Sequence, residues 1–498
     1  MIPRYADTRI AAIWSDEAKL ARWDEVELAV LGARSLLGVL PEADCDTIRC
    51  ALAGHPPDIK WWLERENVVR HDLVAYIDER RRHLPLDLQY RFHEHMTSFD
   101  TEEAAFARAL GDSCAVIAQG LLNTFSTLHT LAHRYRFTPL LDRTHGQWAK
   151  LRTFGGRVLT WYQELALAQQ GFLESIESGC RISRLSGAIG NYGGGLTPEI
   201  EERALSILGL TPLLGATQIL PRVVYAPVAQ NLRLIAEVLG KIALDIRLGA
   251  RSGSPLYHEP FSREQTGSSA MPHKKNTILT EQMEGMVRMV RGRESAIVSN
   301  IPTWESRAIE QSCVERVDWP DIFHLVMRMI IVMNRVLDGL VVYPATMLRE
   351  IIASCGTYAS DEAKNFLAEQ LSRRGIEADV AYRIVQHASF CAFELSARGS
   401  SLFPEAFQSL EQANAAMTHL SQETSFQLHT TIKELIASGT LCCVHGQSVS
   451  DNTLLQWNIL LQEIFSDSAI MGEWEKNFSV QHLLKQEEYL FTAILGKT

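Results

Sequence analysis

Residues 106–132 read FARALGDSCAVIAQGLLNTFSTLHTLA, and apolar side chains return in this stretch every three or four positions. The repeating positions are Phe106, Leu110, Cys114, Ile117, Leu121, Phe125, Leu128 and Ala132. This spacing places them on one face of an α-helix. At 1.5 Å per residue, a helix of about thirty residues is a rod of roughly 45 Å. A rod with one apolar stripe must pack against other helices, so the stretch predicts a helical bundle.

Similar periodicity recurs along the chain, and alternation typical of strands is scarce. The other stretches with long helical patterns are residues 160–175, 232–248, 280–297 and 321–340. We therefore predict an all-α fold. We expect an N-terminal helical domain over residues 1–109, a central long-helix bundle over 110–365, and a smaller helical domain over 366–498.

Composition narrows the class of protein. The chain has 498 residues and a formal net charge of -11, which argues against a protein that mainly coats nucleic acid or an anionic membrane. Its nine cysteines show no CxxC spacing, and no secretory signal opens the sequence, which favours a cytoplasmic protein. The most apolar long stretch, residues 323–343, is interrupted by charges and reads as a buried helix, not a membrane span.

One loop combines groups that suit chemistry on an anion. Residues 262–276 read SREQTGSSAMPHKKN, and the pattern after them predicts a helix over 277–299. Gly267 gives the loop freedom, Ser268 supplies a hydroxyl, and Lys274 supplies a positive charge. Because a helix N-terminus favours negative charge, the loop suits a carboxylate and a proton transfer beside it. The alternative is a solvated basic turn between two helices.

Other polar clusters stand at predicted helix ends, and three of them also have a plain structural interpretation. The clusters are Arg4 and Tyr5; Arg70, His71 and Asp72; Thr97 and Ser98; Thr144 and His145; Gln218; and Arg307, Ser312 and Arg316. The first could be a frayed terminus, the second a structural histidine, and the last a salt-bridged helix face.

We predict no metal site. His93-Glu94-His95 places two histidines two positions apart, which do not share a helix face. Cys442, Cys443 and His445 lack the further ligand that a four-coordinate zinc site needs.

In this order, the clusters resemble the fumarase/aspartase superfamily and, within it, the adenylosuccinate lyases. The loop TGSSAMPHKKN resembles the superfamily signature. Supporting matches over roughly residues 1–390 include RHDLVAY, TSFD, RTHGQ, SGAIGNY, SCVERVDWPD and GLVVYPATML.

The resemblance implies an all-α homotetramer in which each active site draws on three chains. It implies an elimination that releases fumarate without a metal or organic cofactor. The implied substrate is a small succinylated nucleotide. Adenylosuccinate would give AMP, and succinylaminoimidazole carboxamide ribotide would give aminoimidazole carboxamide ribotide. Neither nucleic acid nor membrane is an expected partner.

The resemblance also assigns catalytic roles. Ser268 matches the base, His145 the acid that protonates the leaving nitrogen, and Glu281 a carboxylate that orients this histidine. His71 of the RHD motif completes the catalytic set.

Binding residues carry over in the same way. Those that match contacts to the succinyl carboxylates are Thr97, Ser98, Thr144, Lys274 and Asn276. Those that match contacts to the rest of the substrate are Arg70, Asp72 and Gln218, and those that match the nucleotide and phosphate grip are Arg4, Tyr5, Arg307, Ser312 and Arg316.

The sequence departs from the family pattern around these residues. Adenylosuccinate lyases commonly read TQxxQRDRHA, whereas here ILPRVVYA follows Gln218. Trp148 and Thr277 each replace a proline, and His95 replaces a glycine. Three interpretations stay open: a divergent adenylosuccinate lyase, a fumarate-releasing lyase of specialised metabolism with another succinylated amine, and a catalytically silent helical scaffold.

Overall fold

The computed structural model describes residues 1–397, 431–442 and 449–496. Its contacts divide the chain into two compact units. Unit 1 takes residues 1–124, 164–244 and 278–335, and unit 2 takes residues 125–163, 245–277 and 336–498. The three sequential domains remain a prediction, and Cys443 and His445 lie outside the described residues.

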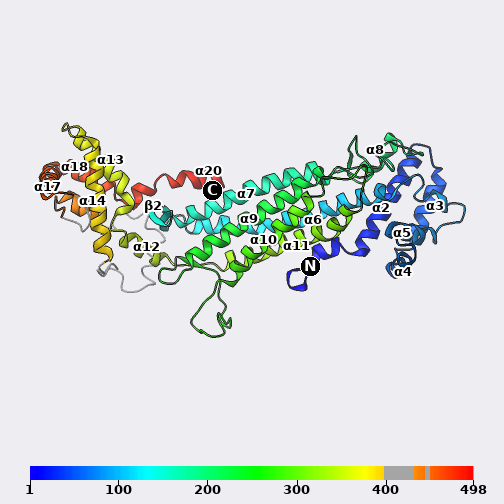
Figure 1. The fold of residues 1–498 in the computed structure, drawn as a ribbon, viewed down its shortest axis with the longest axis horizontal. Coiled ribbons are helices and arrows are strands. Elements are labelled where there is room, and N and C mark those ends of the chain that lie inside the picture. Colours follow the sequence, from blue (N-terminus) through cyan, green and yellow to red (C-terminus); the bar gives the residue numbers. More distant parts are fainter. Residues whose placement is uncertain (398–430, 443–448, 497–498) are drawn as a thin grey trace. The chain divides into compact units, whose positions relative to one another are not determined.

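Long helices dominate the architecture, as the apolar periodicity predicted (Figure 1). They are α6 (Ser98–Arg134), α7 (Phe154–Ser175), α9 (Ala226–Gly249), α10 (Ile278–Val298) and α11 (Glu310–Asp338). Polar side chains also join them in unit 1: Thr124 of α6 donates to Asn334 of α11 over 2.7 Å, and Arg291 of α10 pairs with Glu237 of α9. None of the helices within the described ranges is long and apolar enough to cross a bilayer.

Helix α11 begins well before the predicted residue 321 and runs through Pro320. The rings of Trp319 and Phe323, on either side of this proline, are buried and stack with centroids 6.0 Å apart. Core packing on this face therefore keeps the segment helical despite the missing backbone N–H of proline.

Unit 1 also contains shorter elements. They are η1 (Pro3–Tyr5), α1 (Thr8–Ile13), α2 (Asp16–Leu36), α3 (Glu42–Ala53), α4 (Ile59–Val69), α5 (Asp72–Arg81), η2 (Gln89–Arg91), η3 (Ile176–Cys180), α8 (Pro198–Ile207) and η4 (Arg222–Val224), with a parallel pair β3 (Ile182–Ser183) and β4 (Thr211–Pro212). Their shared core includes Trp23, Trp62 and Tyr76. Tyr76 donates to Asp24 over 2.6 Å, and Arg80 pairs with the same carboxylate over 3.0 Å.

Unit 2 contains the ends of α6, α7, α9 and α11, together with further helices and small strand pairs. Its elements are β1 (Pro139–Thr144), β2 (Gln147–Thr153), β5 (Tyr257–His258), β6 (Val341–Val342), α12 (Pro344–Ala353), η5 (Thr357–Ala359), α13 (Ser360–Ser372), α14 (Ala378–Ala397), α16 (Thr431–Ala437), α17 (Asp451–Phe465), α18 (Ser468–Lys476), α19 (Val480–Leu484) and α20 (Glu487–Leu495). Trp457 and Trp474 anchor its core.

The RTHGQ motif lies at the tip of a β-hairpin, and not in a plain connection between helices as the sequence suggested. Strands β1 and β2 pair antiparallel, with Thr144 opposite Gln147. His145 and Gly146 form the two-residue turn with φ of 52° and 77°. Positive φ at both positions is the geometry of a type I′ turn, whose twist matches that of the strands. The turn therefore presents His145 at an exposed tip.

Candidate active site

The loop of residues 262–276 folds back on itself around Ser268. Its hydroxyl oxygen accepts hydrogen bonds from the backbone N–H groups of Ala270, at 3.3 Å, and Met271, at 3.1 Å. Two fixed donors stabilise negative charge on this oxygen. A deprotonated Ser268 is therefore better tolerated here than an ordinary serine alkoxide would be.

Close backbone contacts hold the loop closed. A Cβ on Gly267 would lie 1.9 Å from the carbonyl oxygen of Lys274, so only glycine fits this position. The Nδ2 group of Asn276 donates to the Gly267 carbonyl over 2.8 Å. Asn276 therefore fastens the loop in the single chain, while the Lys274 side chain stays exposed.

The loop leads into α10, which begins at Ile278 and agrees with the predicted helix. Glu281 lies in the first turn of α10, at an exposed position of unit 1. His145 belongs to unit 2. The pairing of these two residues remains a prediction.

His71 and Ser98 lie next to each other in unit 1. His71 is the N-cap of α5, and its Nδ1 accepts the backbone N–H of Val74 over 3.5 Å. Its Nε2 lies 3.4 Å from the hydroxyl of Ser98. Because Nδ1 accepts a hydrogen bond, a neutral ring carries its proton on Nε2. The Nε2–H group then donates a hydrogen bond to the hydroxyl of Ser98.

The start of α6 is fixed by a buried carboxylate. Asp100 accepts the backbone N–H of Thr97 over 2.8 Å, which is a capping-box contact. Its other oxygen accepts the N–H of Gly187 and pairs with Arg184, each over 3.0 Å, and both charged side chains are fully buried. The glycine-rich segment SGAIGNYGGG is therefore a structural turn that holds Thr97 and Ser98 in place.

Two of the predicted binding residues contact each other next to α6. The guanidinium of Arg307 donates to Gln218 over 3.0 Å and lies 3.9 Å from the ring centre of Phe99. Gln218 in turn donates to the carbonyl of Ala188 over 3.0 Å. Gln218 and the Phe99 ring therefore both contact the Arg307 guanidinium and hold it in place.

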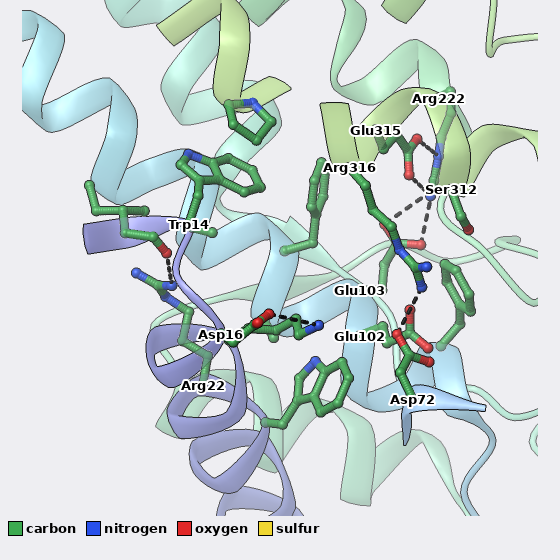
Figure 2. Close-up of a pocket in the computed structure, with 18 residues that line it drawn as sticks. Trp14, Asp16, Arg22, Asp72, Glu102, Glu103, Arg222, Ser312, Glu315 and Arg316 are labelled. Atoms are coloured by element: carbon green, nitrogen blue, oxygen red, sulfur yellow. Dashed lines mark hydrogen bonds and ion pairs between the residues drawn. The ribbon is translucent and has the colours of Figure 1, made fainter. Parts of the chain in front are cut away.

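A cavity of about 290 Å³ lies within unit 1, between helices α1, α2, α6 and α11. Asp72, Ser312 and Arg316 of the predicted site line it, and Arg316 pairs with Asp72 over 2.8 Å (Figure 2). Trp14 and Arg22 lie at the opposite side.

Glu102 also lines this cavity and was missed in the sequence. Burial of its carboxyl, and then the negative charge of Asp72, raise the pKa of Glu102 to about 8. The residue is therefore mostly neutral at pH 7. Only its position one turn after Ser98 could have drawn attention to it.

The unusual segment after Gln218 has a structural role. Arg222 pairs with Glu103 over 2.9 Å and with Glu315 over 2.7 Å, and all three are buried. The hydroxyl of Tyr225 donates to Glu103 over 2.9 Å, and burial together with the Glu103 charge raises the pKa of Tyr225 well above its usual value. The segment thus joins η4, α6 and α11.

The remaining predicted residues lie at element ends. Arg4 and Tyr5 belong to η1, and Arg70 is the C-cap of α4 with φ of 57°. The predicted residues in unit 2 are Thr144, His145, Ser268, Lys274 and Asn276, and the others belong to unit 1.

Comparison with known proteins gives the family and the fold of the chain. Residues 67–292 match the sequence model of a lyase family described as "Lyase". Among solved structures, the fumarate lyase from Mesorhizobium sp. BNC1 has a TM-score of 0.76 at 19% identity, with 99% of each chain covered. The 3-carboxy-cis,cis-muconate lactonizing enzyme from Pseudomonas putida has a TM-score of 0.73 at 19% identity, with 99% of this chain and 97% of that chain covered. These two similarities establish the fold.

Curated relatives are more specific. Adenylosuccinate lyase from Thermotoga maritima is 35% identical over 386 residues, which cover 78% of this chain and 87% of that protein. Adenylosuccinate lyase from Synechocystis sp. is 33% identical over 420 residues, which cover 84% of this chain and 94% of that protein. Identity at this level over most of both chains, together with the helical fold, shows that the chain belongs to the adenylosuccinate lyase family.

Proposed function

We propose that this protein is a carbon–nitrogen lyase that eliminates fumarate from adenylosuccinate to leave AMP. We extend the proposal to succinylaminoimidazole carboxamide ribotide, which would leave aminoimidazole carboxamide ribotide. The structural observation that carries the proposal is the Ser268 hydroxyl with its two backbone N–H donors. The similarity to adenylosuccinate lyases supports the substrate.

Ser268 is the proposed base. The C–H next to the succinyl carboxylate is a very weak acid, so its removal needs a strong base and stabilisation of the resulting charge. The N–H groups of Ala270 and Met271 lower the free energy of a Ser268 alkoxide. The Lys274 ammonium is the proposed partner of the charge that develops on the carboxylate.

His145 is the proposed acid, and Glu281 the carboxylate that orients it. The C–N bond breaks, its electron pair stays on the amine nitrogen, and His145 supplies the proton. Such acid help contributes typically 10²–10⁴-fold to the rate. The exposed hairpin tip leaves His145 free to face a substrate.

The binding residues divide between the two ends of the substrate. Thr97 and Ser98, near the N-terminus of α6, are the proposed contacts to the succinyl carboxylates, with His71 donating to Ser98. At the other end, Arg307, Ser312 and Arg316 are the proposed phosphate grip, supplemented by Arg4 and Tyr5. Thr144 and Asn276 are further proposed contacts to the succinyl group, and Arg70, Asp72 and Gln218 to the rest of the substrate.

We also propose a homotetramer with active sites shared between chains, in the cytoplasm and without a metal or organic cofactor. Large apolar side chains are exposed along the long helices of unit 1. They include Leu122, Leu167, Leu234, Met289 and Ile331. Exposed apolar residues on neighbouring helices are typical of a surface that another chain covers.

The test is incubation of the purified protein with adenylosuccinate, followed by absorbance and by identification of fumarate and AMP. Appearance of both products is the expected result. A folded tetramer that releases neither product would contradict the proposed substrate. The reverse reaction, with fumarate and a panel of amines and nucleotides, would then identify a lyase of specialised metabolism.

A further inference from the structure

The cavity of unit 1 continues along α6 from the predicted succinyl site. Ser98 begins this helix, and Phe99, Glu102 and Phe106, on the next turns, line the cavity. Ser98 and Glu102 are four positions apart, which is about 6 Å along the helix axis and on the same face. A ligand whose carboxylates lie at Thr97 and Ser98 would therefore bring its amine half beside Glu102.

The walls of this cavity suit a flat ring. The aromatic side chains of Trp14, Trp23, Phe99 and Phe106 contribute to its lining. Trp14 is held in place, since its Nε1–H donates to Ser113 over 2.9 Å. Arg316, a predicted phosphate ligand, lies close to Asp72 and Glu102 (Figure 2).

Glu102 differs from the other acids around the cavity. Glu103 and Glu315 both form ion pairs with Arg222, and Asp72 forms an ion pair with Arg316. Within the part of the chain that the structure describes, the Glu102 carboxyl has no hydrogen-bond or ion-pair partner at contact distance. A partly buried carboxyl without a partner is unfavourable, and a ligand that satisfies it gains affinity and specificity.

We propose that Glu102 is a specificity-determining residue that hydrogen-bonds the nitrogen-containing edge of the substrate's amine half. This proposal rests on the proposed lyase function. A neutral carboxylic acid both donates one hydrogen bond and accepts another. It thus matches an edge in which a ring nitrogen accepts and the adjacent exocyclic N–H donates, as on a 6-aminopurine.

The protonation state of Glu102 supplies a distinctive signature. The charged groups that act on it are Asp72 of α5, Arg316 of α11, Arg307 before α11 and Lys19 of α2. Burial and Asp72 dominate, so its pKa is about 8 and the donor form prevails at pH 7. Above pH 8 the carboxyl ionises, loses its O–H donor and places a negative charge near a phosphate dianion. Substrate binding should therefore weaken as pH rises through 8.

The test compares Glu102→Leu and Glu102→Gln with the unchanged protein between about pH 6.5 and 9.5, a range that spans the Glu102 pKa of about 8. We expect Glu102→Leu to raise KM for adenylosuccinate by about tenfold or more at pH 7 with little change in kcat. Glu102→Gln keeps a donor and an acceptor, so KM should stay within about threefold at pH 7. Its KM should also lack the rise above pH 8. A general loss of structure would not remove this pH dependence selectively.

Calorimetric titration with AMP separates this proposal from the proposed function, because it needs no turnover. If the unchanged protein cleaves adenylosuccinate and Glu102→Leu retains its KM and AMP affinity, the lyase function stands and the role of Glu102 is wrong. If adenylosuccinate is not cleaved but AMP binds and Glu102→Leu weakens it, the substrate assignment fails and the role of Glu102 stands. Absence of AMP binding to the unchanged protein overturns the proposal.

Glu17 offers a matched control. It is an exposed acid on α2 that does not line the cavity. Glu17→Leu and Glu17→Gln should leave KM, AMP affinity and the pH profile unchanged. Circular dichroism and melting temperature should be similar for all four variants.

Discussion

At the level of single residues, the proposed removal of the substrate proton depends on the hydroxyl of Ser268. Replacement of Ser268 by Ala removes the proposed base and leaves its two N–H donors without an acceptor. We expect turnover of adenylosuccinate to fall by at least 10²–10⁴-fold, the range typical of a general base. The measurement is steady-state release of fumarate, with circular dichroism and melting temperature to confirm that the fold is unchanged.

The neighbouring Ser269 is the matched control, because it is exposed and also carries a hydroxyl. Ser269→Ala should retain turnover within about threefold, since surface substitutions away from special contacts have small effects. Persistent fumarate release by Ser268→Ala would show that another group removes the proton. A silent scaffold predicts no turnover from any of these proteins.

At the scale of the element, the loop of residues 262–276 depends on a close backbone approach. A Cβ at position 267 would lie 1.9 Å from the carbonyl oxygen of Lys274, and backbone cannot move aside as a flexible side chain does. Gly267→Ala should therefore open the loop, displace Ser268 and reduce kcat at least about tenfold, since small misplacements at a site have large kinetic effects. Turnover and thermal melting measured on the same preparation check this expectation.

Gly472 provides the comparison for that variant, because it lies exposed within α18 and a Cβ there meets nothing within 4 Å. Gly472→Ala should leave kcat unchanged and stabilise the fold slightly, by up to about 1 kcal/mol, because alanine favours helix over glycine. If Gly267→Ala retains full kcat, the closed loop is not needed for the reaction.

At the scale of the whole molecule, sharing of active sites between chains predicts complementation. Ser268→Ala and His71→Gln should each be inactive alone, since each lacks a proposed catalytic group. If the two groups of one site come from different chains, random mixing restores both in about a quarter of the sites of a symmetric oligomer. Co-expression of the two variants with separate tags, followed by assay of the doubly purified hybrid, measures this recovery.

A hybrid of Ser268→Ala with the double variant Ser268→Ala, His71→Gln is the matched negative control, because no chain then carries the proposed base. It should stay inactive under the same treatment. A first hybrid that is equally inactive would show that one chain supplies both groups to each site.

Local patterns in the sequence were sufficient to predict the long helices and to identify the polar motifs. The apolar stripe from Phe106 to Ala132 lies within α6, and the helix predicted after Asn276 is α10. Periodicity predicts such helices because apolar residues spaced three and four positions apart form one buried face, which is recognisable within a few turns. The motif residues His71 and Ser98, and likewise Gln218 and Arg307, proved to be neighbours although they are far apart in the sequence.

Features that depend on partners distant in the sequence became visible in the folded chain. The hairpin that presents His145 needs β1 and β2 to pair, and its weak alternation resembles a loop when read locally. Arg222 lies four positions after Gln218, and its pairing with Glu103 and Glu315 makes it a buried structural cation. Glu102 drew no attention in the sequence, and its neutral state follows from its burial beside the cavity and from the charge of Asp72. The order of the residues specifies which groups this protein has and which helices carry them. The packing of those helices controls which charges are desolvated, and desolvation sets the protonation state of a buried carboxyl group.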